Sequence, residues 1–357
     1  MAVLLALSHL SCSRDDAGGP SGPTGPVDVQ VVVSNGDATR SAGASSTDNE
    51  IQRLRIYAFN AAGALTGYAL ADNLSGRTYV PMALSEGGDT YFYVIANDHF
   101  GPNPMVQDQS VNNWATLTQT DLQSVVFNLW NFAGWTQIDG KSISPMSNNR
   151  YKETSGELPY ENDYATPVYV TGNSQIIPVT VQHVLGRLRL MFNKDASLGD
   201  EISVKLTRAA VYHRPDAFRL YNSGSDAIAF TDKSDVETLV DEFVSEGAPI
   251  ALDPKPADSY TEVARTFLAP NPYGSPDAKG TAPVTDTDKA YRLELTVSFA
   301  YSGGGPTEKS YTVYLPPVAR NAGIDVLGTF TAAIDDLTFN VMTNAWDEKV
   351  ITVPPFM

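Results

Sequence analysis

Apolar and polar residues alternate with a period of two in several windows of this 357-residue chain. The clearest window runs from Tyr291 to Phe299, where five apolar side chains are separated by Arg, Glu, Thr and Ser. Successive side chains of an extended strand point to opposite faces, so this window predicts a strand with one buried face. Other windows predict further strands at 54–58, 91–95, 168–171, 179–181, 188–192, 311–315 and 337–341.

Turn-forming residues separate these windows. The chain has 27 glycines and 23 prolines, and charged residues make up only 18% of it. Short strands joined by many turns are typical of β-sandwiches, and a chain of this length favours two domains. We therefore predict an all-β fold of two tandem sandwich domains. The predicted boundary lies around residues 172–178, between two groups of strands, so that the domains span 41–175 and 176–357.

Two windows show the period of a helix instead. Residues 118–129 place their apolar side chains on one face, and Thr118 with Asp121 fits a weak capping-box pattern. Residues 235–246 do the same, with Ser234 as a candidate N-cap and Gly247 past the end. We expect two short helices that serve packing.

The N-terminus has the character of a targeting segment. Residues 1–11 are mainly apolar but too few to span a bilayer as a helix. They end in Leu10-Ser11-Cys12, which resembles a lipoprotein signal-peptidase site. This similarity implies a signal over 1–12 and a lipidated (palmitoylated) Cys12; a chance cysteine is the alternative. The Gly-, Pro- and Ser-rich residues 13–26 predict a flexible tether, as an outer-membrane protein at the cell surface needs.

The charge and the motif content argue against several functions. A net charge of −17 repels nucleic-acid phosphates, so nucleic acid is not an expected partner. The sequence has no HExxH motif, Cys cluster, nucleophile elbow, P-loop or GxGxxG motif. His183 lies beside an apolar strand, and we interpret it as a core residue. We therefore expect no cofactor, no metal and no enzymatic activity.

The order of several segments resembles the Bacteroidetes-type fimbrillins, the subunits of type V pili. After the lipoprotein-like start and a strand that ends near an arginine come IQRLRIYAFNAAGAL (51–65) and TYFYVIAND (90–98). VQHVLGRLRLMF (181–192), VYLPPVARNAGIDVLGTF (313–330) and a late strand with Trp346 complete the order. The resemblance implies two transthyretin-like sandwiches, export as a lipoprotein and cleavage by a trypsin-like, Arg-specific protease. It also implies polymerisation with other fimbrial subunits by strand exchange.

The first strand and the loop after it fit such processing. Val27, Val29, Val31 and Val33 alternate with the residues between them and form an amphipathic strand. Arg40 follows in a Gly-, Ser- and Ala-rich loop where proteases prefer to cut, so cleavage is predicted between Arg40 and Ser41. A cut there would free the strand within residues 13–40 and leave an unpaired sheet edge beside an apolar groove. Such an edge is a template for another chain's strand.

The predicted donor strand is the C-terminal tail, residues 348–356. Ile351 and Val353 share one face of it, and Val350 and Phe356 belong to the same segment. The two prolines at 354–355 would end its pairing because proline has no N–H to donate. The alternative is that both ends of the chain are ordinary edge strands of their own domains.

Two other functions stay open from the sequence. A monomeric glycan-binding surface lipoprotein would use exposed aromatic side chains, for which Trp114, Trp130 and Trp135 are candidates. A surface glycosidase would need a carboxylate pair, and the sequence marks none. We predict a structural subunit of a fimbrium that supports adhesion.

Overall fold

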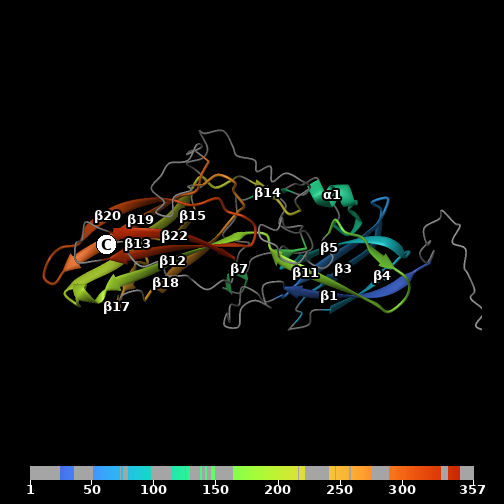
Figure 1. Ribbon diagram of the computed structural model, residues 1–357, viewed down its shortest axis with the longest axis horizontal. Helices are drawn as coiled ribbons and strands as arrows, with labels where there is room; N and C mark the ends of the chain where they lie inside the picture. The colour runs from blue at the N-terminus through green and yellow to red at the C-terminus, as the bar shows by residue number, and fades with distance from the viewer. Residues whose placement is uncertain are drawn as a thin grey trace, which may run out of the picture.

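The structure, a computed structural model, describes the residues 25–35, 51–72, 74, 79–97, 114–124, 126–128, 137–138, 141–142, 146–148, 164–215, 217–221, 241–245, 247–256, 259–274, 289–330 and 337–345. These residues form many strands and little helix, so the predicted all-β class is confirmed. The strands form two groups that follow one another along the longest axis, with the N-terminal group at right and the C-terminal group at left (Figure 1). No helix in the described ranges is long and apolar enough to cross a membrane.

One eight-stranded sheet builds the N-terminal half, with the order β3-β2-β5-β9-β11-β1-β4 and with β10 paired to β5. Its strands are β1 (Val27–Asn35), β2 (Leu54–Asn60), β3 (Leu65–Ala71), β4 (Tyr79–Leu84), β5 (Gly88–Ala96), β9 (Met146–Ser147), β10 (Val168–Val170) and β11 (Gln175–His183). Residues of β1, β4 and β11 share one buried core with residues of β2 and β5, so the sheet folds over into two layers. All of β11 except Gln175 lies beyond the boundary predicted after residue 175, yet the strand pairs with β1 and β9 in this sheet.

Two five-stranded sheets build the C-terminal half. The first contains β12 (Gly186–Asp195), β17 (Pro254–Lys255), β18 (Thr261–Leu268), β21 (Ala322–Phe330) and β22 (Leu337–Ala345). The second contains β13 (Ile202–Tyr212), β15 (Asp241–Val244), β16 (Ile250–Leu252), β19 (Arg292–Tyr301) and β20 (Thr307–Tyr314). Leu190 and Val326 of the first sheet share a core with Leu206 and Leu295 of the second, as a sandwich requires. In β19 the predicted alternation is confirmed, because its odd-numbered residues from 293 to 299 are buried.

The first predicted helix is present only in part. α1 covers Gln119–Ser124, and residues 126–128 form the strand β6 (Val126–Asn128) instead. The predicted capping box is confirmed: the Asp121 N–H donates to the Thr118 hydroxyl (3.1 Å), and the Thr118 N–H donates to the Asp121 carboxylate (3.0 Å). The hydrogen bonds from Thr118 also lower the pKa of Asp121. The helix ends early because β6 pairs with β14 (Ala217–Arg219), a contact that local periodicity does not encode.

The second predicted helix is wrong where it can be checked. Residues 241–244 form β15, which pairs antiparallel with β13, and Val244 joins the sandwich core. Sheet pairing therefore overrides a helical pattern at this position. Residues 235–240 and 246 lie outside the described residues. A small ribbon of β7 (Gln137–Ile138) and β8 (Lys141–Ser142) and 3₁₀ turns at Trp114–Thr116 and Ala196–Leu198 complete the fold.

Candidate assembly site

The first strand lies inside its sheet and not at an edge. β1 pairs parallel with β11, where Val31 is opposite Ile177, and antiparallel with β4, where Val31 is opposite Val80. The first strand is therefore an interior strand of its own sheet and not the edge strand that the alternative named, whereas the C-terminal end lies outside the described residues. We call the space that β1 occupies between β4 and β11 the β1 slot.

The four valines predicted to face inward all do so. Val27, Val29, Val31 and Val33 are at most 3% exposed. The neighbouring strands contribute buried side chains of Met82 and Val179 on either side. The facing layer contributes side chains of β2 and β5, which are Leu54, Ile56, Ala58, Phe92, Val94 and Ala96. The slot therefore has an apolar floor and two strand edges as walls.

Backbone contacts show which way each residue of β1 directs its polar groups. The Asp28 N–H donates to the Asn173 side-chain oxygen (2.8 Å), and the Asp28 C=O accepts from the Ser174 N–H (2.7 Å). Both groups of Asp28 thus point toward β11. Because the direction alternates along a strand, Gln30, Val32 and Ser34 also direct their backbone groups to β11, and the odd-numbered valines direct theirs to β4. Loss of β1 would leave backbone groups unpaired on both neighbours.

Each neighbour of β1 contains a proline, and neither proline removes a bond to β1. Pro81 of β4 is opposite Gln30, and Pro178 of β11 is opposite Val32. At both rows the alternation turns the proline nitrogen away from β1. Ser85 has an odd number, as Pro81 does, so its N–H points to the same side of the chain. This N–H donates to the Thr66 carbonyl oxygen of β3 (2.8 Å). The missing N–H groups therefore lie on the sides of β4 and β11 that face away from β1, where they limit pairing with further strands. The sides of β4 and β11 that face the slot remain fully able to pair.

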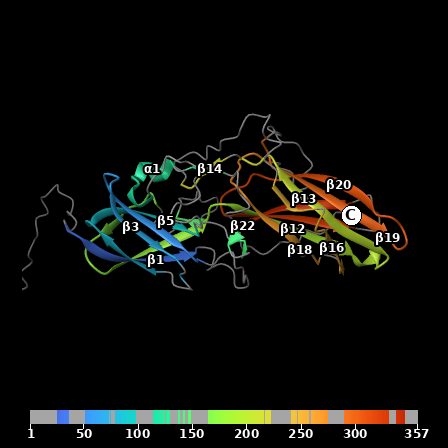
Figure 2. The ribbon, with the colours of Figure 1, turned by 180° about the vertical axis from the view of Figure 1, so that it is seen from behind.

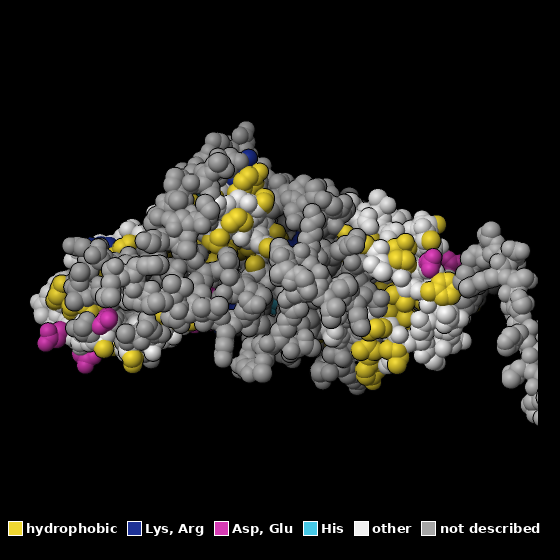
Figure 3. Space-filling model, in the orientation of Figure 1, with side chains coloured by type: hydrophobic (Ala, Val, Ile, Leu, Met, Phe, Trp, Pro, Cys, Tyr) yellow, Lys and Arg dark blue, Asp and Glu magenta, His cyan; other side chains and the backbone are white. Residues whose placement is uncertain are grey.

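The outer face of the same layer exposes hydrophobic side chains. Tyr79 and Ile176 are among the exposed large hydrophobic residues, and Val32 lies in the same row as Tyr79. Figure 3 shows hydrophobic side chains at several places on the surface of the N-terminal half.

A second apolar cluster lies on the opposite face of β2 and β5. Both strands are buried on both faces, so their apolar runs lack a clean alternation. Tyr57, Phe59 and Tyr93 of these strands pack with residues of the C-terminal half, namely Val184, Leu185, Leu220, Tyr221, Phe267 and Ala269. We call this set the junction cluster.

Helix α1 is fixed to the junction cluster through Tyr93. The side chains of Gln119 and Gln123 each donate to the Tyr93 hydroxyl oxygen, at 3.0 and 2.5 Å. Burial raises the pKa of Tyr93 to about 12, so its hydroxyl stays protonated. These contacts position the helix and show no catalytic arrangement.

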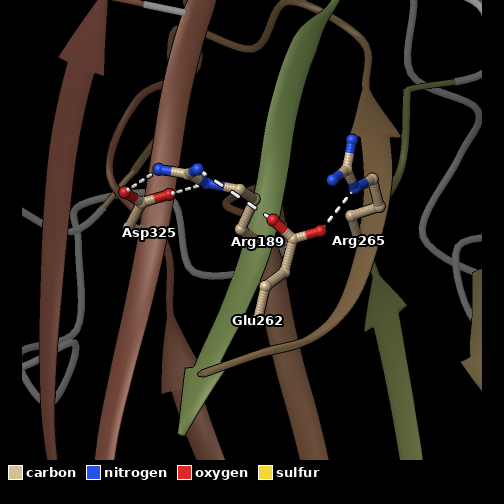
Figure 4. Close-up of polar contacts among 4 residues, drawn as sticks. All are labelled: Arg189, Glu262, Arg265 and Asp325. Atoms are coloured by element: carbon tan, nitrogen blue, oxygen red, sulfur yellow. Dashed lines mark hydrogen bonds and ion pairs between the residues drawn. The ribbon is translucent and has the colours of Figure 1, made fainter. Parts of the chain in front are cut away.

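The polar row around the buried Asp325 in the C-terminal half is also structural. Asp325 accepts two hydrogen bonds from Arg189, at 2.7 and 2.5 Å, and Glu262 lies between Arg189 and Arg265 (Figure 4). Each carboxylate therefore faces a guanidinium, and the row is no glycosidase-type acid pair. Across the described ranges, no group of three or more His, Cys, Asp or Glu side chains is arranged to hold a metal.

His183 ends β11 and is fully buried, in agreement with its interpretation as a core residue. Burial, together with the nearby charge of Arg187, lowers the pKa of His183 to about 3. The side chain is therefore neutral at physiological pH. A neutral imidazole in this position serves packing.

Several predicted site residues cannot be placed. Cys12, Arg40, Ser41 and the tail residues Val350, Ile351, Val353 and Phe356 lie outside the described residues. The same holds for Trp130, Trp135 and Trp346, and for the side chain of Trp114. No sequence pattern pointed to Tyr221 and Arg320, which form hydrogen bonds at the junction. The sequence around Tyr221 has no periodicity, and Arg320 stands out only as part of the segment 313–330 that resembles the fimbrillins.

Comparison with known proteins agrees with this architecture. Residues 26–185 match the family described as major fimbrial subunit protein (FimA). No curated protein matches the chain in sequence.

Solved structures extend the similarity to the rest of the chain. A candidate cell adhesion protein from Bacteroides eggerthii has a TM-score of 0.55 at 14% identity, covering 92% of this chain and 98% of its own. A candidate cell adhesion protein from Parabacteroides distasonis has a TM-score of 0.51 at 11% identity, with 90% and 99% covered. The fimbrilin FimA from Porphyromonas gingivalis has a TM-score of 0.50 at 11% identity, with 89% and 96% covered. At these identities the similarity establishes the fold. The resemblance to the Bacteroidetes-type fimbrillin family is therefore confirmed, with residues 26–185 carrying the family match.

Proposed function

We propose that this chain is a structural subunit of a cell-surface fimbrium that joins its neighbours by strand exchange at the β1 slot. In this proposal it is exported as a lipoprotein anchored through Cys12 and is cleaved between Arg40 and Ser41. The fimbrial family match over residues 26–185 supports the structural role. The observation that carries the mechanism is the position of β1, an interior strand with four buried valines close to the N-terminus.

The energetics of the slot favour exchange over simple loss of the strand. Complete burial of a valine contributes about 1.5–3 kcal/mol, so the four inward valines together contribute roughly 6–12 kcal/mol as an upper estimate. Cleavage after Arg40 would leave this contribution in place, because it cuts the chain outside β1. If β1 left the slot, this contribution would be lost, and a competing strand with similar apolar side chains would restore it as it enters.

The choice of Arg40 is supported by the surroundings of the next arginines. Arg55 lies within β2, is fully buried and donates to the Tyr68 hydroxyl (2.5 Å). Arg53 is largely buried and forms an ion pair with Asp72 (2.8 Å). Proteases need an extended, accessible backbone, which neither β2 nor the largely buried Arg53 directly before it offers.

The incoming strand is proposed to be the tail of another subunit, residues 348–356. Ile351 and Val353 would occupy two of the inward positions that the valines of β1 leave. Backbone hydrogen bonds to both β4 and β11 would give affinity, and the apolar floor would give register.

The test is cleavage of the purified full chain with an Arg-specific protease. Oligomers should form only after cleavage, and the assembled material should begin at Ser41 by N-terminal sequencing. The Arg40→Gln variant should stay uncleaved and monomeric under the same conditions, as size-exclusion chromatography would show. Assembled material that begins at another residue, or assembly of Arg40→Gln at the wild-type level, would refute the processing site.

A further inference from the structure

A short arm of the C-terminal half reaches back onto the N-terminal half. After β13 the chain leaves its sandwich, and β14 pairs antiparallel with β6, so that Phe218 is opposite Phe127. Leu220 and Tyr221 follow directly and are fully buried. Both ribbon views place β14 near the junction of the two halves, on the side of α1 (Figures 1 and 2). We call residues 217–221 the arm.

Tyr221 ends the arm against the middle of β5. Its ring contacts Tyr93 at 4.8 Å and Tyr164 at 5.1 Å between centroids, both in edge-to-face geometry. Its hydroxyl donates to the Val94 carbonyl oxygen (3.0 Å). The contact is buried, so the hydrogen bond has no competition from water.

Val94 belongs to both the junction and the β1 slot. Its carbonyl receives the Tyr221 hydroxyl, while its side chain is fully buried in the same cluster as the four valines of β1. Asn148 holds the same stretch of β5, because its side-chain oxygen accepts from the Val94 N–H (2.9 Å) and its amide donates to the Phe92 carbonyl (2.7 Å). The floor of the slot is thus fixed from behind by side chains.

The C-terminal half fixes the arm in turn. Arg320 donates to the Leu220 carbonyl oxygen (2.9 Å), and the Asn321 N–H donates to the Leu185 carbonyl in the segment that joins the halves (3.1 Å). Contacts therefore run without a break from Arg320, two residues before β21, through the arm to the floor of the slot.

We propose that the arm keeps the floor of the β1 slot in place when the slot is empty, so that Tyr221 is a positioning residue for strand acceptance. This inference rests on the proposed strand exchange. Loss of β1 would remove four side chains from one core, and the surrounding strands would relax into the space. A floor that is held from behind keeps the shape that an incoming strand needs, which lowers the cost of binding.

A matched pair of variants distinguishes a positioning role of Tyr221 from a general effect on the stability of the fold. Tyr221 and Tyr291 are both fully buried, and each donates to a backbone carbonyl at 3.0 Å. Tyr221 does so across the junction, whereas Tyr291 bonds to Ala269 within the C-terminal half. In the uncleaved chain, Tyr221→Phe and Tyr291→Phe should lower the midpoint of thermal unfolding by similar amounts.

The two variants should differ after cleavage. The probe is a labelled peptide with the sequence of residues 27–35, which the cleaved full chain takes up in place of its own strand. We expect uptake of about one equivalent by the wild type and by Tyr291→Phe, and about five- to tenfold weaker binding by Tyr221→Phe, as for one buried hydrogen bond. Arg320→Gln, which removes the donor at the other end of the arm, should weaken binding in the same direction.

Two results would overturn the inference. Wild-type affinity in both Tyr221→Phe and Arg320→Gln would show that the arm does not position the slot, while strand exchange itself would stand. A wild-type chain that is cleaved but takes up no peptide would refute strand exchange and the positioning role together.

Discussion

Replacing Val31 with alanine measures how strongly its side chain holds β1 in place. Val31 is fully buried, opposite both Val80 and Ile177. The change removes two carbon groups worth about 0.8 kcal/mol each, and unfilled space adds about 1 kcal/mol, so the chain should lose about 2–3 kcal/mol of stability. Val32 is the matched control, because it lies next in the same strand, faces outward and is half-buried.

Both substitutions lose the same strand propensity, so their difference reports burial alone. Val31→Ala should cost roughly 1–2 kcal/mol more than Val32→Ala in denaturant unfolding of the uncleaved chain. After cleavage at Arg40, fragment 1–40 should leave Val31→Ala about 5–30 times faster than Val32→Ala, as native mass spectrometry would follow. Equal losses in the two variants would refute the assignment of the odd-numbered valines to the core.

Three further predictions concern other parts of the chain. Cys12→Ala should release the protein from the outer membrane, and unchanged partitioning into detergent would exclude the lipid anchor. Ile351→Asp with Val353→Asp should leave the monomer folded but stop assembly after cleavage, because two carboxylates would enter an apolar slot at several kcal/mol each; assembly at the wild-type level would mean that the tail is not the donor. The pKa of His183 is about 3 in the folded chain and about 6.5 in the unfolded one, so only the unfolded state binds this proton between those values and stability falls as pH drops below 6.5. From pH 7 to pH 5 this loss is about 2 kcal/mol, and His183→Gln should remove that part of the pH dependence in denaturant unfolding.

The sequence was sufficient for several strands and for the buried faces of β1 and β19, but it did not mark β4 or β13. Alternation at residues 291–299 gave the buried side of β19, and the valines at 27–33 gave the buried side of β1. These predictions succeed because the direction of a side chain in a strand depends only on whether its position is odd or even. The capping box of Thr118 and Asp121 is equally local, since its two partners are three residues apart.

The tertiary structure alone decided which strands meet. β1 pairs with β11, whose residues follow it by 146 positions in the register, and this pairing made β1 an interior strand. The helical pattern at 241–244 became β15 because β13 offered a strand to pair with. Tyr221 became a support of the slot through contacts with Val94 and Tyr93, which are far from it in the chain. Such contacts depend on which surfaces come together when the cores close, and a local pattern of residues has no information about its distant partner.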